Sequence, residues 1–128
     1  MNELFFNSKN KKMKDFLLLI RTEGSVWTDL PKEKLQHHIE NGTAYIGNLM
    51  KENKLKSAQP LAAGSRIVTE ENGVITDGPF NESKEVIAGY FHIVAADMNE
   101  ALEIAKANPI FKDITAKIEV HPMMAVGR

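Results

Sequence analysis

Titratable side chains that could transfer a proton gather in the second half of the chain. Residues 76–97 read TDGPFNESKEVIAGYFHIVAAD, a polar turn that runs into an apolar strand. Asp77 lies in the turn, Lys84 follows it, His92 lies within the strand, and His121 lies near the end of the chain. A histidine close to a carboxylate is a plausible general acid–base pair. Asp77, Lys84, His92 and His121 are therefore the catalytic candidates.

Residues that could bind a small molecule either surround this turn or carry a polar tip on a neighbouring element. They are Asp77, Gly78, Pro79, Phe80, Glu82, Lys84, His38, Tyr45 and Glu119. Each also has a structural interpretation. Asp77 could simply cap the turn, as Asx turns do, and Lys84 could simply bridge to a neighbouring glutamate. His38 and Tyr45 lie on the flank of a predicted helix, where such residues more often form the polar margin of a buried face than a pocket.

The sequence offers no recognisable metal or cofactor motif. It has four histidines and no cysteine, and the histidines lack a spacing such as H-x-x-x-H. His37 and His38 would diverge by about 100° on a helix, so they could not readily bind one ion together. A phosphate-binding loop and a nucleophile elbow are also absent from the sequence. We therefore expect neither a metal nor a cofactor.

Composition narrows the classes of partner. The chain has 128 residues, 43% of them hydrophobic and 26% charged, which is ordinary for one globular domain. Its net charge of −1 gives no basic footprint for nucleic acid. The lack of cysteine excludes disulfides and a cysteine nucleophile, and no apolar run approaches the roughly 20 residues of a membrane span. We expect a cytoplasmic protein that binds neither nucleic acid nor membrane.

The predicted elements alternate between strands and helices. Strands are expected at residues 16–20, 55–61, 66–69, 74–76, 86–96 and 115–122. A helix should begin near Pro31, with Thr28 or Asp29 as its cap. A second helix should begin at Asp97 in a capping box and end before Pro109. The dipeptide Asn72-Gly73 is a strong signal for a type I′ hairpin turn.

This order predicts an α+β sandwich of ferredoxin-like type with an extra β-hairpin, preceded by an N-terminal extension at residues 1–12 and occupying residues 13–128 as a single domain. Two helices cover only one face of such a sheet, yet strands 16–20 and 86–96 are apolar on both faces. The open face should therefore be buried, and a second copy of the chain is the simplest cover.

Several segments together resemble the DGPF-type branch of the YCII-related family. DGPFNESKE followed by IAGYFHIVAADMNEALEIAKANP matches its pattern, with Asn81 and Ser83 where Ala and Thr are usual. The early MKDFLLLI is similar to the family's first strand, and KIEVHP to its closing strand, with His121 where Arg is usual. The similarity runs from Met13 to about Met123. It implies a homodimeric α/β barrel in which two sheets meet face to face.

The resemblance also marks candidate site residues without giving them roles. The matched motif positions are Asp77, Gly78, Pro79, Phe80, Glu82, Lys84, Glu85 and Gly89. Some members of the wider family carry a histidine on the first helix and an aspartate before a proline at the end of the second, regarded as a possible active-site pair. Here Asn108 precedes Pro109, and His38 matches the helix position only loosely, so we do not assign that pair.

Three functions remain open. The first is a small-molecule pocket protein, possibly an acid/base enzyme, with its site between the DGPF turn and the barrel interior. The second is a non-catalytic ligand-sensing or regulatory dimer, which the resemblance allows because DGPF-type domains also occur in proteins linked to transcription factors. The third is a cofactor-free isomerase or oxygenase, which rests on fold analogy alone.

Overall fold

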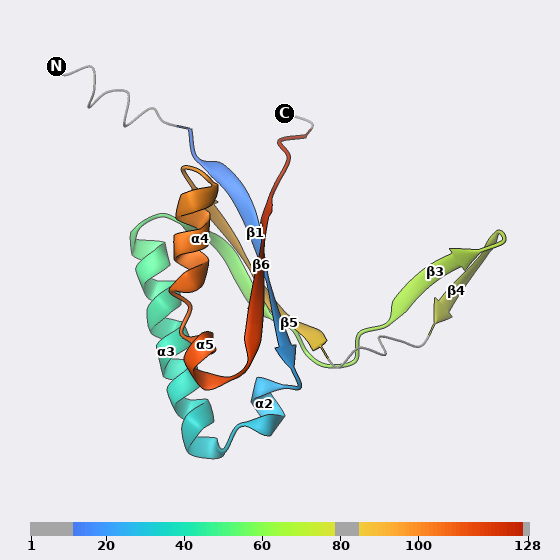
Figure 1. The fold of residues 1–128 in the computed structure, drawn as a ribbon, viewed down its shortest axis with the longest axis horizontal. Helices are drawn as coiled ribbons and strands as arrows, with labels where there is room; N and C mark the ends of the chain where they lie inside the picture. The colour runs from blue at the N-terminus through green and yellow to red at the C-terminus, as the bar shows by residue number, and fades with distance from the viewer. Residues whose placement is uncertain (1–11, 79–84, 127–128) are drawn as a thin grey trace.

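A four-stranded antiparallel sheet with helices on one face forms the body of the molecule, and a separate hairpin projects from it (Figure 1). The computed structural model describes residues 12–78 and 85–126. Its elements are β1 (Lys14–Glu23), α2 (Val26–Asp29), α3 (Lys32–Lys51), β2 (Leu55–Pro60), β3 (Ile67–Glu71), β4 (Val74–Gly78), β5 (Glu85–Ala95), α4 (Met98–Lys106), α5 (Ile110–Asp113) and β6 (Ala116–Pro122).

The strand order of the sheet is β2-β5-β1-β6, and each neighbouring pair is antiparallel. In this order the two outer strands each follow a helix, while β5 and β1 lie side by side in the centre. The predicted ferredoxin-like α+β fold with an added hairpin is therefore confirmed. Every strand predicted from the sequence is present, although β1 extends beyond the apolar run at residues 16–20 because its ends still pair with β5.

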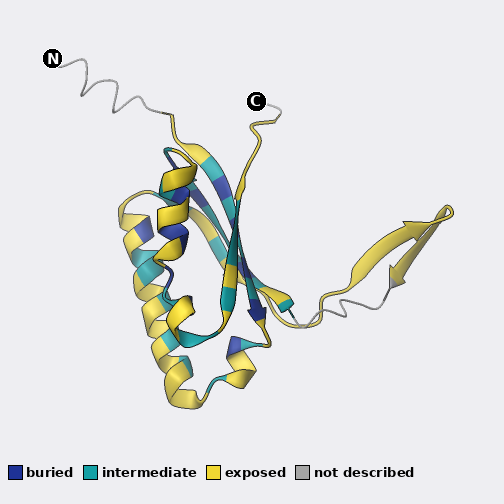
Figure 2. Cartoon of the chain, in the orientation of Figure 1, coloured by how far each residue is buried: buried dark blue, intermediate teal, exposed yellow. Residues whose placement is uncertain are grey.

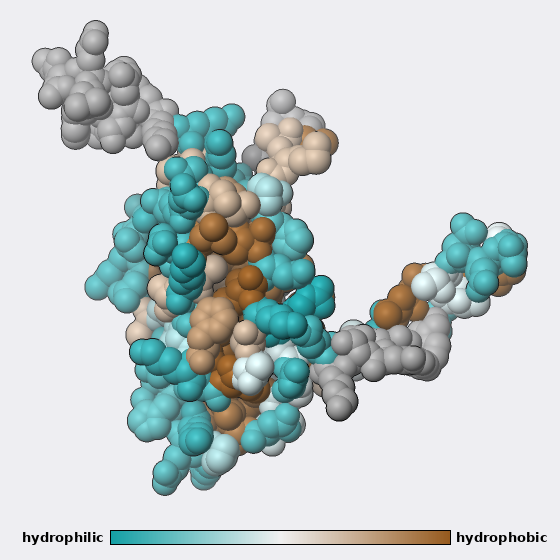
Figure 3. All heavy atoms as spheres, viewed as in Figure 1, coloured by the Kyte–Doolittle hydropathy of each residue, from teal (hydrophilic) through white to brown (hydrophobic). Residues whose placement is uncertain are grey.

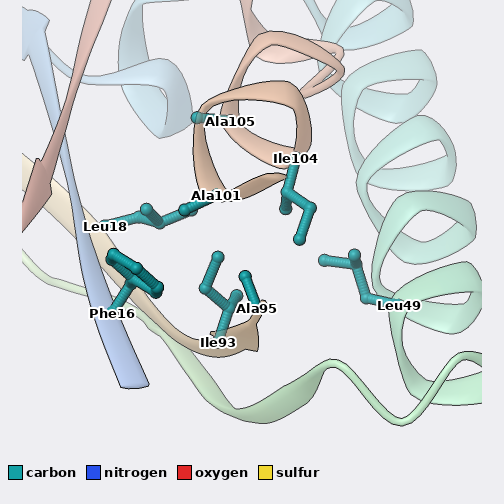
Figure 4. Close-up of a cluster of buried hydrophobic side chains, with 8 residues drawn as sticks. All are labelled: Phe16, Leu18, Leu49, Ile93, Ala95, Ala101, Ile104 and Ala105. Atoms are coloured by element: carbon teal, nitrogen blue, oxygen red, sulfur yellow. The ribbon is translucent and has the colours of Figure 1, made fainter. Parts of the chain in front are cut away.

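The core lies between the sheet and the helices (Figure 2). Along β1, burial alternates with the two-residue period of a strand, so Phe16, Leu18 and Ile20 are buried while their neighbours are less so. Phe16 and Leu18 belong to a cluster of apolar side chains drawn from the sheet, α3 and α4 (Figure 4). Its members are Phe16, Leu18, Leu49, Ile93, Ala95, Ala101, Ile104 and Ala105. The alanines of α4 let that helix approach the sheet closely.

Local signals set the ends of α4 as predicted. The carboxylate of Asp97 accepts a hydrogen bond from the backbone N–H of Glu100 at 2.9 Å, and Glu100 accepts one from the N–H of Ala96 at 2.9 Å. This arrangement is similar to a capping box, except that Glu100 reaches back to Ala96, one residue before the cap Asp97. The helix ends at Lys106, ahead of Pro109.

The predicted cap of α3 is wrong. Thr28 and Asp29 belong to the separate short helix α2, which is capped by the Ser25 side chain. Pro31 occupies the cap position of α3 and offers no side-chain hydrogen bond. The Asp29 carboxylate instead accepts a hydrogen bond from the Ser25 N–H at 2.9 Å. It therefore does not cap α3.

The hairpin turn forms as predicted. Asn72 and Gly73 both have positive φ, 52° and 80°, as a type I′ turn requires. β3 and β4 pair in register from Ile67 with Gly78 to Glu71 with Val74. The hydroxyl oxygens of Thr69 and Thr76 lie 3.2 Å apart across the ribbon.

The second face of the sheet has no cover among the described residues. Leu17 and Leu19 of β1 alternate with the buried positions, so they point away from the helices. Their partners in register, His92 and Tyr90 on β5, share that side. We call this surface the open face. Its burial by a second copy of the chain stays a prediction.

The core cluster leads to a paired prediction on α4. Ile104→Ala should lower the free energy of unfolding by about 3 kcal/mol, because Ile104 is 8% exposed and its removal leaves a cavity. Leu102→Ala, in the same helix and at 36% exposure, should cost about 1 kcal/mol or less. Urea unfolding of both variants measures the difference. Equal losses would contradict this assignment of the core.

Candidate functional site

A cavity of about 310 Å³ lies on the helix side of the sheet, between α3 and strands β2 and β5. Its walls are mostly apolar. They include Ile20, Val26, Trp27, Ile39, Ile46 and Phe91. Two polar side chains of α3, His38 and Thr43, also reach its lining. A largely apolar cavity with a few polar groups is the usual form of a small-molecule site.

Glycine helps to keep this space open. Gly42 lies in the apolar stripe of α3 that begins at Leu35, and an added Cβ there would meet no atom within 4 Å. Leu35, Ile39, Gly42, Ile46 and Leu49 recur at helical spacing along this stripe, but only Leu49 is buried in the core. Ile39 is 39% exposed because the chain leaves a hollow beneath the first turns of α3 where packing would otherwise occur.

His38 is held by a carboxylate at the edge of this cavity. Its Nδ1 lies 2.8 Å from Oδ2 of Asp113, and both side chains are 16% exposed. An ionised carboxylate can only accept a hydrogen bond, so Nδ1 carries the proton. In the neutral ring, Nε2 is then the unprotonated nitrogen, which is available as a proton acceptor. Asp113 thus orients the ring.

Asp113 was not among the residues predicted from the sequence. The family pattern places the carboxylate before Pro109, where this chain has Asn108, so His38 had no predicted partner. In the structure, the side-chain oxygen of Asn108 accepts a hydrogen bond from the Ile110 N–H at 2.9 Å, at the start of the one-turn helix α5. That helix ends on Asp113, which it directs back to α3. Asn-Pro as a helix start was the available signal, since proline favours the first helical turn.

Tyr45 lines the same cavity, but its hydroxyl is already used. The hydroxyl donates a hydrogen bond to the carbonyl of Ile104, and the ring meets Phe91 edge to face with centroids 5.7 Å apart. Burial raises the pKa of Tyr45 to about 12. Tyr45 is therefore a protonated wall residue at neutral pH. Both His38 and Tyr45 thus line the cavity. Tyr45 also lies at the polar margin of the buried face of α3, with its hydroxyl bonded to Ile104.

Three other candidates lie on the open face of the sheet, away from the cavity. His92 Nε2 lies 2.9 Å from the Asp15 carboxylate, which also accepts from Lys56 Nζ at 2.7 Å. Lys56, and then His92, hold the pKa of Asp15 below its usual value.

The second cluster on this face contains Glu119 and His121. The guanidinium of Arg21 contacts the Glu119 carboxylate at 2.8 Å, and His121 lies 3.8 Å from it. Arg21 is the main reason that the pKa of Glu119 is lowered. Both clusters therefore pair each carboxylate with a cation and a histidine.

The described part of the DGPF segment lies apart from both the cavity and the open face of the sheet. Asp77 is exposed on β4 and pairs with Arg66 at 2.7 Å, and Gly78 ends that strand. The remaining predicted residues of the turn, Pro79, Phe80, Glu82 and Lys84, lie outside the described residues. The sequence-predicted residues thus fall into three groups, of which the cavity group alone joins a histidine to a pocket.

The buried phenol leads to a pH-dependent prediction. A folded-state pKa raised from 10.0 to about 12 stabilises the fold below pH 10, and this contribution is lost as the pH rises towards 12. Tyr45→Phe should cost about 1 kcal/mol near pH 7, through loss of the hydrogen bond to Ile104. The difference between variant and wild type should shrink above pH 10. Urea unfolding between pH 7 and 11 measures it, and a constant difference would contradict the assignment.

Two kinds of feature are absent from the described residues. In the parts of the chain that the structure describes, no helix is long and apolar enough to span a membrane. Among the same residues, no three histidine or acidic side chains converge as metal ligands.

A sequence search against curated proteins gives no match. The family model of the YCII-related domain matches residues 13–124, nearly the whole chain. The chain therefore belongs to the YCII-related family.

Proposed function

We propose that this chain is a homodimeric protein that binds a small molecule in the helix-side cavity and transfers a proton there. His38 is the proton-transferring group, and Asp113 is its positioning residue. The observation that supports this most is the 2.8 Å contact between His38 Nδ1 and Asp113 Oδ2 at the edge of an apolar cavity. A histidine oriented by a carboxylate, with its other nitrogen available to a ligand, is a recurring arrangement for general base catalysis.

The chemistry follows from the tautomer. With Nδ1–H donating to Asp113, Nε2 of His38 accepts a proton from the bound molecule. The ring becomes an imidazolium, and the nearby carboxylate of Asp113 stabilises that charge. The apolar walls exclude water and so strengthen this electrostatic interaction. The protonated ring can then return the proton to another atom of the same molecule or to solvent.

The cavity also limits the class of ligand. At about 310 Å³ it lies at the small end of ligand pockets, which span roughly 300–1,000 Å³. Its described lining contains no lysine or arginine, so it offers no cation for a phosphate or a polycarboxylate. The ligand best suited to it is a small, mostly apolar molecule with one dissociable proton. Trp27 and Phe91 offer aromatic surfaces to such a molecule.

The open face supports the dimeric part of the proposal. Leu17, Leu19, Tyr90 and Val94 bring apolar side chains to this face, and the two ion-paired clusters flank them. An isologous contact between two such faces would bury the apolar strip and leave the ion pairs near its margins. The site between the DGPF turn and the barrel interior, foreseen from the sequence, has less support, because Asp77 is exposed and paired with Arg66.

A sensing dimer without catalysis is the second candidate. The His38–Asp113 contact also ties α3 to α5, so the same cavity would serve a protein that only binds its ligand. Ligand binding with no proton exchange would favour this candidate.

Adjacent histidines on α3 give a matched test. A panel of small carbon acids is screened by ligand-observed NMR, and each binder is then followed for incorporation of solvent deuterium at its acidic C–H. Wild type should accelerate the exchange. His38→Gln should lower the rate about 10²–10⁴-fold, the usual contribution of a general base. His37→Gln should leave it unchanged, because His37 is 76% exposed and points away from the cavity lining.

Two further variants separate binding from catalysis. Gly42→Leu should fill the cavity and abolish binding without loss of stability, since glycine is a poor helix former and its position is open. Asp113→Asn should keep binding but slow the exchange. Exchange by His38→Gln at the wild-type rate would refute the catalytic role of His38.

A further inference from the structure

The β3–β4 hairpin is an arm that packs little against the other described residues. Its two strands contact chiefly one another, and residues 67–77 are all exposed (Figure 2). Four large aliphatic side chains of the hairpin are exposed. They are Ile67 at 43%, Val68 at 67%, Val74 at 59% and Ile75 at 72%. An isolated two-stranded hairpin is marginally stable in water, so this arm needs a surface to pack against.

The arm and the open face of the sheet border the same space. Helices α3 and α4 lie on one side of the sheet, and the arm projects on the other (Figure 1). The arm therefore flanks the open face, and a protein bound to this face would also contact the arm. Both surfaces lack a partner among the described residues, so one occupant would satisfy both.

An apolar surface connects the two. Ile87 pairs in register with Arg21, whose position in β1 alternates with the buried ones, so Ile87 lies on the open face. Leu61 follows at the exit of β2. Both line a hollow at the base of the arm, together with Trp27 and Ile67. Leu61, Ile87 and Trp27 are 41%, 38% and 46% exposed. Hydrophobic residues at the base of the hairpin are also visible in Figure 3.

The area of the open face favours a contribution from the arm. Four strands about 4.8 Å apart and about seven residues long cover roughly 450 Å² in projection. A stable interface buries about 800 Å² on each partner. The face alone is thus a small interface. An arm of two paired strands lying along the partner would bring the contact closer to the usual size.

We infer that the hairpin is a dimerisation arm, which clasps a second copy of this chain seated on the open face. The inference rests on the homodimer proposed above. In an isologous pair, each arm holds the other subunit, so two arms are buried by one two-fold contact. Val68 and Ile75 lie on one face of the ribbon and Ile67 and Val74 on the other, and the face with Val68 and Ile75 is its contact surface. Glu70 and Glu71, which make no ion pair among the described residues, lie near the tip, where charge keeps an exposed strand from unspecific pairing.

Sedimentation equilibrium tests the assembly. Wild type should be a dimer of the 14.3 kDa chain. The arm variant Val68→Asp/Ile75→Asp should weaken the dimer at least tenfold, with an unchanged far-ultraviolet circular dichroism spectrum. Met50→Asp, at a position on α3 that is 61% exposed, is the control and should not change the dissociation constant. Leu17→Asp on the open face should also weaken the dimer.

The outcomes separate the two proposals. A monomeric wild type would overturn both the dimer and the arm. A dimer weakened by Leu17→Asp but unaffected by the arm variant would overturn only the arm. Loss of the dimer through the arm variant but not through Leu17→Asp would show that the arm pairs elsewhere, which would overturn the clasp on the open face.

Photochemical cross-linking gives a test that does not depend on a disruptive variant. A benzophenone amino acid is placed at Ile75, or at Glu40 on α3 as control. Irradiation of the Ile75 protein should give a band at twice the monomer mass, with the adduct mapped by mass spectrometry to the partner's body. The Glu40 protein should give none. An adduct within one chain, or adducts only with other proteins in a lysate, would overturn the clasp.

Discussion

The hydrogen bond between His38 and Asp113 connects the two halves of this chain at the point where its cavity opens. His38 comes from α3, and Asp113 from the end of α5, just before β6. The bond fixes the imidazole ring, holds the one-turn helix α5 against α3, and so sets one border of the cavity. Both partners are largely buried, and each satisfies the other. Removal of either would leave a buried polar group without its partner, which is costly in itself.

The second constraint is that the described helices cover only one face of the sheet. α3 and α4 bury one face and build the core with small residues such as Ala101 and Ala105. The other face keeps apolar side chains between two clusters of ion pairs. Strands with two apolar faces are typical of sheets that are buried on both sides. The open face and the projecting arm are therefore surfaces suited to self-association. The cavity lies on the opposite side, so the proposed assembly and the proposed ligand binding would use different faces of the same sheet.

Local chemistry explains which features the sequence revealed. The turn at Asn72-Gly73 and the capping box at Asp97 depend on neighbouring residues alone, and both were predicted. The His38–Asp113 pair depends on how α5 packs against α3, across most of the chain, and no spacing rule carries that information. The family pattern has its carboxylate directly before Pro109, whereas the carboxylate that pairs with His38 here is Asp113, one helical turn later.

The same distinction applies to the predicted site residues. His38 and Tyr45 were placed on the correct side of α3 because helical periodicity fixes it. His92, Glu119 and His121 were predicted as strand residues, and they are, but their partners Asp15 and Arg21 belong to β1 and follow only from strand order. The histidines that could do chemistry were thus evident from the sequence, while their carboxylate and cationic partners followed only from the fold.

The tautomer of His38 is the most direct measure of the central claim, that Asp113 prepares this ring as a base facing the cavity. Long-range ¹H–¹⁵N correlation spectra of the imidazole nitrogens, recorded above the titration of the ring, report which nitrogen carries the proton. We expect Nδ1 to be protonated and Nε2 unprotonated in the wild type, and this preference to be lost in Asp113→Asn. A ring protonated at Nε2, or a tautomer that does not respond to Asp113→Asn, would contradict the account.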